Sequence, residues 1–395
     1  MKKFGWNPTV LTIKSNEGQL TDKEQQLLNG ISIVEITPPF DRTTSAAKKP
    51  SADKKKANRI SGFISDQIDK HMPLDTWILL FRLRYSSIKE DVAKCKPDLI
   101  WSTGDPWSGH WLGYKLSKEL NTPWIADFRD PWTLSNVNLR PRSLFSHRVD
   151  RKIERKYVQT ADHLVFTSRQ TEKLYKNHYH LQDHKTSTIY NAYDQLLNQK
   201  SMDWDVQLDD DYFHVLFFGR FRKLSPVDPI AFAVSSMKHE KRKQLKIHSF
   251  GAMSREDTEL IEKLNLEDQF IVHDPVLPSQ TMNVLEKADL LLVSTDHRRK
   301  NIIPAKLWDY LATDRPVLSV APNPEVGTIL ESVGQGKQIS PDDPKKIASF
   351  LEERISEKEE GNSNKNSRKS YSHKFTIEAA TSALAQRMDQ VLNIG

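Results

Sequence analysis

Short apolar runs alternate along the first half of the chain with longer segments whose apolar residues recur at helical spacing. The predicted strands are 97–101, 123–128 and 161–166, and the predicted helices are 107–120 and 144–160. Thr167 and Gln170 match a capping box that would open the next helix. This alternation predicts a parallel sheet with helices on both faces.

The pattern lapses at 199–211, a polar and acidic stretch that we interpret as a linker, and then restarts. Predicted strands in the second half are 214–218, 245–251, 270–273 and 288–294, followed by the segment 301–320. The fold class expected from both halves is α/β, with two doubly wound Rossmann-like domains. Sheets of this kind bind ligands at the carboxyl ends of their strands, so we expect the two domains to face a ligand across a cleft.

The expected organisation has four parts. An N-terminal Rossmann-like domain covers 1–198, the linker covers 199–211, and a second Rossmann-like domain covers 212–374. An amphipathic helix at 375–395 closes the chain, and we expect it to pack back towards the N-terminal domain.

Composition narrows the class of protein. The chain of 395 residues contains one cysteine, Cys95, which excludes an internal disulfide and argues against a zinc cluster. No run approaches the roughly 18 apolar residues of a membrane span, and no signal-peptide pattern follows Met1. We therefore expect a cytoplasmic protein.

The net charge of +6 comes from basic clusters at 48–56, 148–156, 238–246 and 298–300. Such clusters could contact an anionic membrane surface, nucleic acid or a phosphorylated substrate, or could be solvated helix faces. Aromatic residues are not interleaved with these clusters as a base-stacking surface requires, so we do not expect nucleic-acid binding.

The segment 301–320 predicts a loop, a short helix and a buried strand. Pro304 suits a first helical turn, and Lys306 and Asp309 share one helix face. The free N–H groups of Ile302–Lys306 and the positive helix end would favour a phosphate, while Asp309 could accept hydrogen bonds from a ribose or sugar. An ordinary helix start in an α/β protein is the alternative.

A glycine turn follows the predicted strand 214–218. Gly219, Arg220, Arg222 and Lys223 place three cations directly after that strand. Arginine pairs with phosphate oxygens through two parallel hydrogen bonds, so this turn is a candidate diphosphate site. Together with Pro304 it gives two anion-binding elements in one domain.

Charged residues also gather where the strand 123–128 meets its loop. Asp127, Arg129 and Asp130 lie beside aromatic rings, which predicts a partly buried catalytic site. Alternatively, Arg129 bridges the two carboxylates and only holds the loop. His110 falls in the first turn of its predicted helix, where the dipole disfavours its protonated form; it is a candidate catalytic residue, although a lone histidine in such a position more often has a structural role.

The sequence contains no motif for a zinc site, a nucleotide-binding Walker loop or a catalytic triad. No His/Cys spacing suits zinc, no Walker-type loop appears, and no Ser/His/Asp arrangement can be argued from residue order. We therefore expect no metal ligands and no obligatory cofactor.

The chain resembles bacterial family-4 glycosyltransferases of the GT-B fold, of the type that builds polysaccharides. The blocks that carry the resemblance are Lys96-Pro97-Asp98-Leu99-Ile100-Trp101, Asp127-Phe128-Arg129-Asp130-Pro131-Trp132, Glu154 with Ala161-Asp162, Tyr190-Asn191-Ala192, Gly219-Arg220 and Pro304-Ala305-Lys306-Leu307-Trp308-Asp309. The resemblance implies transfer of a sugar from a nucleotide diphosphate sugar, with retention of anomeric configuration and no obligatory metal.

The resemblance also implies roles for single residues. Arg220, helped by Arg222 or Lys223, would neutralise the leaving diphosphate. Asp309 matches a glutamate that binds the ribose hydroxyls, and Arg129 stands where many members place a histidine beside the donor sugar. The amides around Ile303–Lys306 would hold the phosphates or the donor sugar.

Three departures from the family pattern matter. Asn301 stands in place of the first glutamate, which contacts the donor sugar, and Asp309 is one methylene shorter than the second. The family's first strand, glycine turn and helix have no counterpart before Phe4, from which we expect a wrong start codon, a truncation or an inactive paralogue.

We interpret the sequence as a glycosyltransferase that moves a sugar onto a lipid-linked or saccharide acceptor in cell-surface polysaccharide assembly. Its expected partners are a nucleotide sugar, that acceptor and the inner surface of the membrane. Two alternatives stay open: a nucleotide-sugar epimerase of the same fold, and a truncated protein that binds nucleotide sugars without catalysis.

Overall fold

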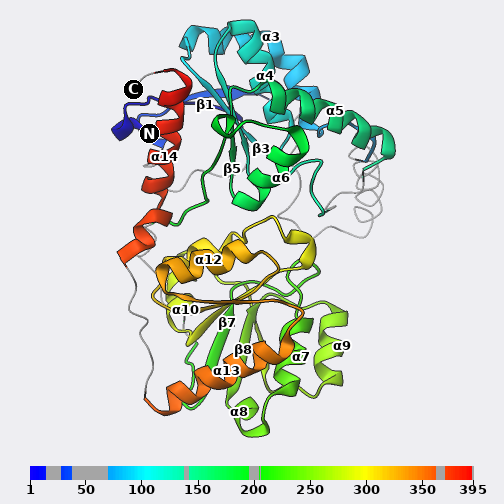
Figure 1. Cartoon of the computed structure of the whole chain (residues 1–395), viewed down its shortest axis with the longest axis vertical. Helices are drawn as coiled ribbons and strands as arrows, with labels where there is room; N and C mark the ends of the chain where they lie inside the picture. Colours follow the sequence, from blue (N-terminus) through cyan, green and yellow to red (C-terminus); the bar gives the residue numbers. More distant parts are fainter. Residues whose placement is uncertain are drawn as a thin grey trace, which may run out of the picture. The chain divides into compact units, whose positions relative to one another are not determined.

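The structure is a computed structural model of the chain. It describes residues 1–14, 28–37, 70–137, 142–194, 204, 206–361 and 370–393. The chain divides into two compact units. The first contains Met1–Thr167, Thr171–Ile189 and Thr381–Gly395, and the second contains Ser168–Gln170 and Tyr190–Ala380. Figure 1 shows the elements of each unit.

The first unit is built on a parallel four-stranded sheet of order β3-β4-β5-β6. Its strands are β3 (Ile100–Gly104), β4 (Trp124–Phe128), β5 (His163–Phe166) and β6 (Thr186–Thr188). Its helices are α3 (Trp77–Cys95), α4 (Ser108–Leu120), α5 (Leu144–Thr160) and α6 (Arg169–Tyr179), with a 3₁₀ turn at Asp183–Lys185. Every residue of β4 and β5 is buried, as expected for strands covered by helices on both faces.

Both ends of the chain contribute to this unit. β1 (Thr9–Ile13) and β2 (Ser32–Ile36) form a separate parallel pair after a 3₁₀ turn at Lys2–Phe4. The closing helix α14 (Ile377–Val391) contributes Met388 to an apolar cluster with Ile125. The Trp6 indole donates a hydrogen bond of 2.9 Å to Asp389, which ties the two ends of the chain together (Figure 1).

The second unit is built on a parallel six-stranded sheet of order β12-β11-β10-β7-β8-β9. Its strands are β7 (Phe213–Phe217), β8 (Leu245–Phe250), β9 (Phe270–His273), β10 (Leu290–Ser294), β11 (Val317–Val320) and β12 (Gly336–Ile339). Its helices are α7 (Asp228–Ser236), α8 (His239–Lys243), α9 (Arg255–Lys263), α10 (Thr281–Glu286), α11 (Lys306–Leu311), α12 (Pro324–Val333) and α13 (Pro344–Glu359). Short 3₁₀ turns lie at Pro278–Gln280, His297–Arg299 and Ser370–Phe375.

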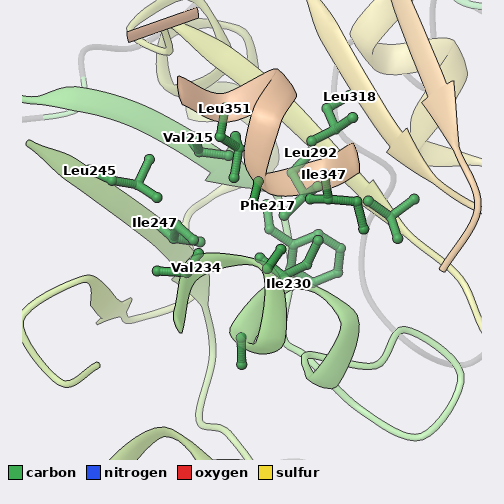
Figure 2. Packing of buried hydrophobic residues seen from close by; sticks show 14 of the residues in the cluster. Val215, Phe217, Ile230, Val234, Leu245, Ile247, Leu292, Leu318, Ile347 and Leu351 are labelled. Carbon is green, nitrogen blue, oxygen red and sulfur yellow. The ribbon is translucent and has the colours of Figure 1, made fainter. Parts of the chain in front are cut away.

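The strand β7 has a core on each face of this sheet, because successive side chains of a strand point to opposite sides. Val215 and Phe217 pack with Ile230 of α7 and Ile347 of α13, as Figure 2 shows. Leu216 points to the other face, where it joins the cluster that includes α10, α11 and α12. Strands buried on both faces explain the nearly continuous apolar runs in the sequence.

The α/β class and the parallel sheets expected from the sequence are confirmed. The predicted capping box is wrong: the Thr167 hydroxyl donates to the Arg129 carbonyl, and the N–H groups of Arg169 and Gln170 donate to the Glu325 carboxylate. A carboxylate far along the chain therefore satisfies the first turn of α6.

Part of the linker expected at 199–211, namely 199–203 and 205, lies outside the described residues. Trp204 is buried, and its ring packs against Phe250 and His273 in the second unit. Among the helices of the described residues, none combines the length and the apolar character needed to cross a membrane.

Candidate functional site

In the second unit, the turn after β7 has a position that requires glycine. Gly219 has φ +134°, and a Cβ built there would lie 2.3 Å from the Lys306 ammonium nitrogen. Lys306 begins α11, and its nitrogen lies 4.2 Å from the centre of the Phe217 ring. The glycine turn and the helix start, which are far apart in the sequence, therefore meet.

The cations around this point act on one another. Burial, together with the positive charges of Arg222 and Arg299, lowers the pKa of Lys306 to about 8, whereas the carboxylate of Asp309 opposes this shift. Burial also raises the pKa of Asp309, which Lys306 opposes. A partly buried ammonium group that two guanidinium groups repel is electrostatically unfavourable, and a bound anion would stabilise it. The cluster of Arg222, Arg299 and Lys306 thus has the charge to hold a phosphate.

The remaining donor-site residues predicted from the sequence lie around this cluster. Arg220 and Lys223 are exposed in the turn after β7. Asn301 is partly exposed, and its carbonyl accepts a 2.6 Å hydrogen bond from the Ser168 hydroxyl. Ile303 and Pro304 are buried, so of these two only main-chain groups could face a ligand.

Tyr310 holds the site together, although the sequence suggested only a buried face for it. Its hydroxyl accepts a 2.9 Å hydrogen bond from the Phe218 N–H and donates one of 3.1 Å to the Leu292 carbonyl. These bonds fix α11 against the ends of β7 and β10. The sequence did offer a signal for this role. A tyrosine on the buried face of a helix needs a polar partner for its hydroxyl group, so Tyr310 could have been predicted to form a hydrogen bond inside the unit.

In the first unit, Asp127 occupies the end of β4 and is buried. Burial raises its pKa to about 7, while Arg129 and the Thr103 hydroxyl oppose the shift. Its Oδ1 atom finds no hydrogen-bond partner among the described residues. A carboxyl group in this state can take up or release a proton near neutral pH.

The pKa of Asp127 predicts a pH-dependent effect of Asp127→Asn on stability. Between about pH 4 and pH 7 the folded chain keeps a proton that the unfolded chain has lost, so ionisation destabilises the fold as pH rises. The asparagine variant should be more stable than wild type by up to about 4 kcal/mol above pH 7, and the gap should close towards pH 4. Urea unfolding of both proteins from pH 4 to pH 8 measures it, and a gap that does not change with pH would contradict the assignment.

Arg129 and Asp130 are both exposed in the loop that follows β4. His110, by contrast, is fully buried in the first turn of α4, and burial lowers its pKa to about 3. Its Nδ1 lies 2.8 Å from the Ser102 hydroxyl, which also accepts a 2.8 Å bond from the Trp124 indole. The ring is therefore neutral and surrounded by protein.

Glu154 organises the loop after β4, a role that the sequence did not reveal. This fully buried carboxylate accepts hydrogen bonds from the Thr133 N–H and hydroxyl and from the hydroxyls of Tyr175 and Tyr179. The Tyr175 hydroxyl also accepts a 2.9 Å bond from the Trp132 N–H. Trp132 and Thr133 directly follow the charged segment, so Glu154 fixes the path of the chain beyond Asp130.

Among the residues that the structure describes, no group of three or more His, Cys, Asp or Glu side chains has an arrangement that could hold a metal ion. Cys95 is exposed and unbonded to another cysteine. The described residues offer positive charge around Lys306 and a titratable carboxyl group at Asp127.

Comparison with solved structures identifies the fold. A glycosyltransferase from Rickettsia africae has a TM-score of 0.63 at 13% identity, covering 98% of this chain and 100% of that one. The sucrose-phosphate synthase of Thermosynechococcus elongatus has a TM-score of 0.64 at 15% identity, with coverage of 98% and 100%. The chain has the GT-B fold. The HepE protein of Anabaena, solved with UDP and glucose, shares this fold, with a TM-score of 0.59 at 12% identity and coverage of 97% and 100%.

Sequence comparison adds a partial family match. Residues 47–195 match the family described as Glycosyltransferase Family 4, which places the similarity in the first part of this GT-B chain. No curated protein matches the sequence. The family match and the fold together support a glycosyltransferase.

Proposed function

We propose that this protein is a glycosyltransferase that takes a sugar from a nucleotide diphosphate sugar and gives it to a lipid-linked or saccharide acceptor. The observation that carries the proposal is the convergence of Gly219, Arg222, Arg299 and Lys306 at the carboxyl ends of β7 and β10. This edge is where open α/β sheets bind ligands, and the charge there is that of a diphosphate site. The family match over 47–195 supports the reaction class.

In the proposed reaction the second unit stabilises the leaving diphosphate. Arg220, Arg222 and Lys223 are exposed, so their side chains are free to reach phosphate oxygens, and Lys306 would add a fourth positive charge. Negative charge grows on the diphosphate as its bond to the sugar breaks, so cations placed there lower the barrier. Asp309 would accept hydrogen bonds from the ribose, while Asn301 and the main chain at Ile303 and Pro304 would lie nearest the donor sugar.

The first unit would supply the acceptor side. Arg129 would contact the donor sugar, as the resemblance implies, and Asp130 would bind acceptor hydroxyls. Ionisation of Asp127 would change the net charge of this loop, and the positive charge of Arg129 favours that ionisation by lowering the pKa of Asp127. We propose retention of configuration, no obligatory metal, and a role in cell-surface polysaccharide synthesis at the cytoplasmic face of the membrane.

The pKa of Lys306 predicts how nucleotide binding depends on pH. In the free protein the ammonium loses its proton near pH 8, whereas a bound diphosphate would favour the charged form. The dissociation constant of a nucleoside diphosphate should therefore rise by up to about tenfold per pH unit above pH 8. Titration calorimetry from pH 7 to pH 10 measures this dependence.

Two variants control that experiment. Lys306→Ala should bind more weakly and lose the pH dependence over this range. Lys306→Arg should also lose it while keeping a positive charge, because a guanidinium does not titrate there. A wild-type dissociation constant that stays flat above pH 8 would remove Lys306 from the binding site.

The proposed reaction is tested by a transfer assay. Purified protein is incubated with radiolabelled nucleotide diphosphate sugars and with lipid-linked and saccharide acceptors, in the presence and absence of EDTA. We expect label to move to an acceptor, with release of an equal amount of nucleoside diphosphate and no loss in EDTA. An altered donor sugar without transfer would instead identify an epimerase and contradict the proposal.

A further inference from the structure

The helix α5 presents an exposed face made of cations and two large apolar side chains. Its exposed residues are Leu144, Phe145, Arg148, Arg151, Lys152, Arg155, Lys156 and Gln159. At 3.6 residues per turn they span about 140° of the helix. Leu144 is 78% exposed and Phe145 67%, and both lie in the first turn of α5.

The charge of this face is uncompensated. The two carboxylates of α5, Asp150 and Glu154, are both buried and point into the unit, where their hydrogen-bond partners lie. Among the described residues, none of the five exposed cations forms an ion pair with a carboxylate. Lys156 lies over the Tyr114 ring, with 4.6 Å from its nitrogen to the ring centre. The exposed face therefore carries five positive charges and no negative one.

We infer that the exposed face of α5 docks on an anionic lipid bilayer. Leu144 and Phe145 would enter the boundary between headgroups and acyl chains, and the arginines and lysines behind them would contact lipid phosphates. Docking of this face would place the enzyme of the proposed function, on which this step rests, at a membrane surface. Vesicle binding requires no sugar substrate, so a failure of docking and a failure of the proposed transfer are observed separately.

The composition of the face favours a bilayer over nucleic acid. Exposed leucine and phenylalanine side chains at one end gain from leaving water, and lipid provides an apolar phase for both. A strand of nucleic acid would instead require aromatic rings spaced along the basic groove, and Phe145 is the one aromatic residue on this face.

Co-sedimentation of the full chain with vesicles tests the inference. We expect binding to vesicles of phosphatidylcholine mixed with phosphatidylglycerol, and binding at least tenfold weaker to phosphatidylcholine alone. Replacing Arg148, Arg151 and Lys152 by alanine should weaken binding by on the order of a hundredfold. Replacing Leu144 and Phe145 by serine should weaken it by on the order of tenfold.

Matched variants in the second unit test whether vesicle binding depends on the face of α5 or only on the number of exposed cations and apolar side chains in the protein. Lys243, Lys263 and Lys345 are exposed lysines, and their triple alanine variant removes the same charge elsewhere. Leu277 and Phe232 are exposed residues of the same two apolar types, and their serine variant is the second control. We expect both controls to bind as wild type does, and controls that weaken binding as much as the α5 variants would overturn the inference.

A fluorescent reporter measures insertion directly and does not depend on the affinity. In a Cys95→Ser background, Phe145→Cys carries an environment-sensitive dye, and Phe232→Cys is its control. We expect a blue shift of the Phe145→Cys reporter alone when anionic vesicles are added. No shift, or tight binding to double-stranded DNA that the serine variant retains, would overturn the docking of this face on lipid.

Discussion

Arg220→Ala is expected to weaken binding of the nucleoside diphosphate by roughly 10- to 100-fold, which corresponds to about 1.5–3 kcal/mol for a charge-assisted hydrogen bond. The Arg220 side chain is exposed in the turn after β7 and forms no ion pair among the described residues. Its removal should therefore leave the fold intact, and the loss should appear in binding. Titration calorimetry with a nucleoside diphosphate measures the effect.

The matched control is Arg255→Ala, which removes an exposed arginine of the same unit on α9. It should bind the nucleotide as wild type does. Asp309→Ala should also weaken binding, whereas Asp309→Glu should keep it, because a longer carboxylate can still accept from the ribose. Unchanged affinity in folded Arg220→Ala and Asp309→Ala variants together would remove the proposed nucleotide site.

The second large effect is expected at Arg129. Arg129→Ala should lower kcat by about 100- to 1000-fold while changing donor affinity only a few-fold, as for a group that acts mainly in the transition state. The loop should survive the substitution, because it is held by its main chain, whose carbonyl at 129 accepts from Thr167. Donor affinity and turnover are measured on the same preparation.

A further measurement and a control variant distinguish a catalytic role of Arg129 from a structural one. Because Arg129 opposes the rise in the pKa of Asp127, its removal should move the Asp127 titration to higher pH. Arg84→Ala, an exposed arginine on α3, should leave turnover unchanged. If Arg129→Ala retains turnover within a few-fold of wild type, the loop has no part in the reaction.

Much of the secondary structure could be predicted from the local pattern of apolar and polar residues. The helix predicted at 144–160 and the strand predicted at 270–273 have these bounds in the structure. The helix has apolar residues at helical spacing, and the strand is a short apolar run followed by Asp274 and Pro275, which favour a turn. The separate pairing of β1 with β2 was not predicted, since pairing depends on which strands lie adjacent in space and not on the pattern of either strand.

The candidate site was predictable only where topology brings chain segments together. The meeting of Gly219 with Lys306 follows from the rule that strand ends share one edge of a parallel sheet. The hydrogen bonds of Glu154 to Tyr175 and Tyr179 depend on how two helices pack, and no local period encodes that packing. The bond from Ser168 to the Asn301 carbonyl joins residues 133 positions apart.

The central claim, that the second unit binds a nucleotide diphosphate sugar through the cations around Lys306, is tested most directly by thermal denaturation with a panel of these sugars. A ligand at 100 times its dissociation constant adds about 2.7 kcal/mol to stability. We predict that at least one nucleotide diphosphate sugar raises the melting temperature of the wild type and that the rise is clearly smaller for Lys306→Ala at the same ligand concentration. No stabilisation by any member of the panel at millimolar concentration, or equal stabilisation of Lys306→Ala, would contradict the claim.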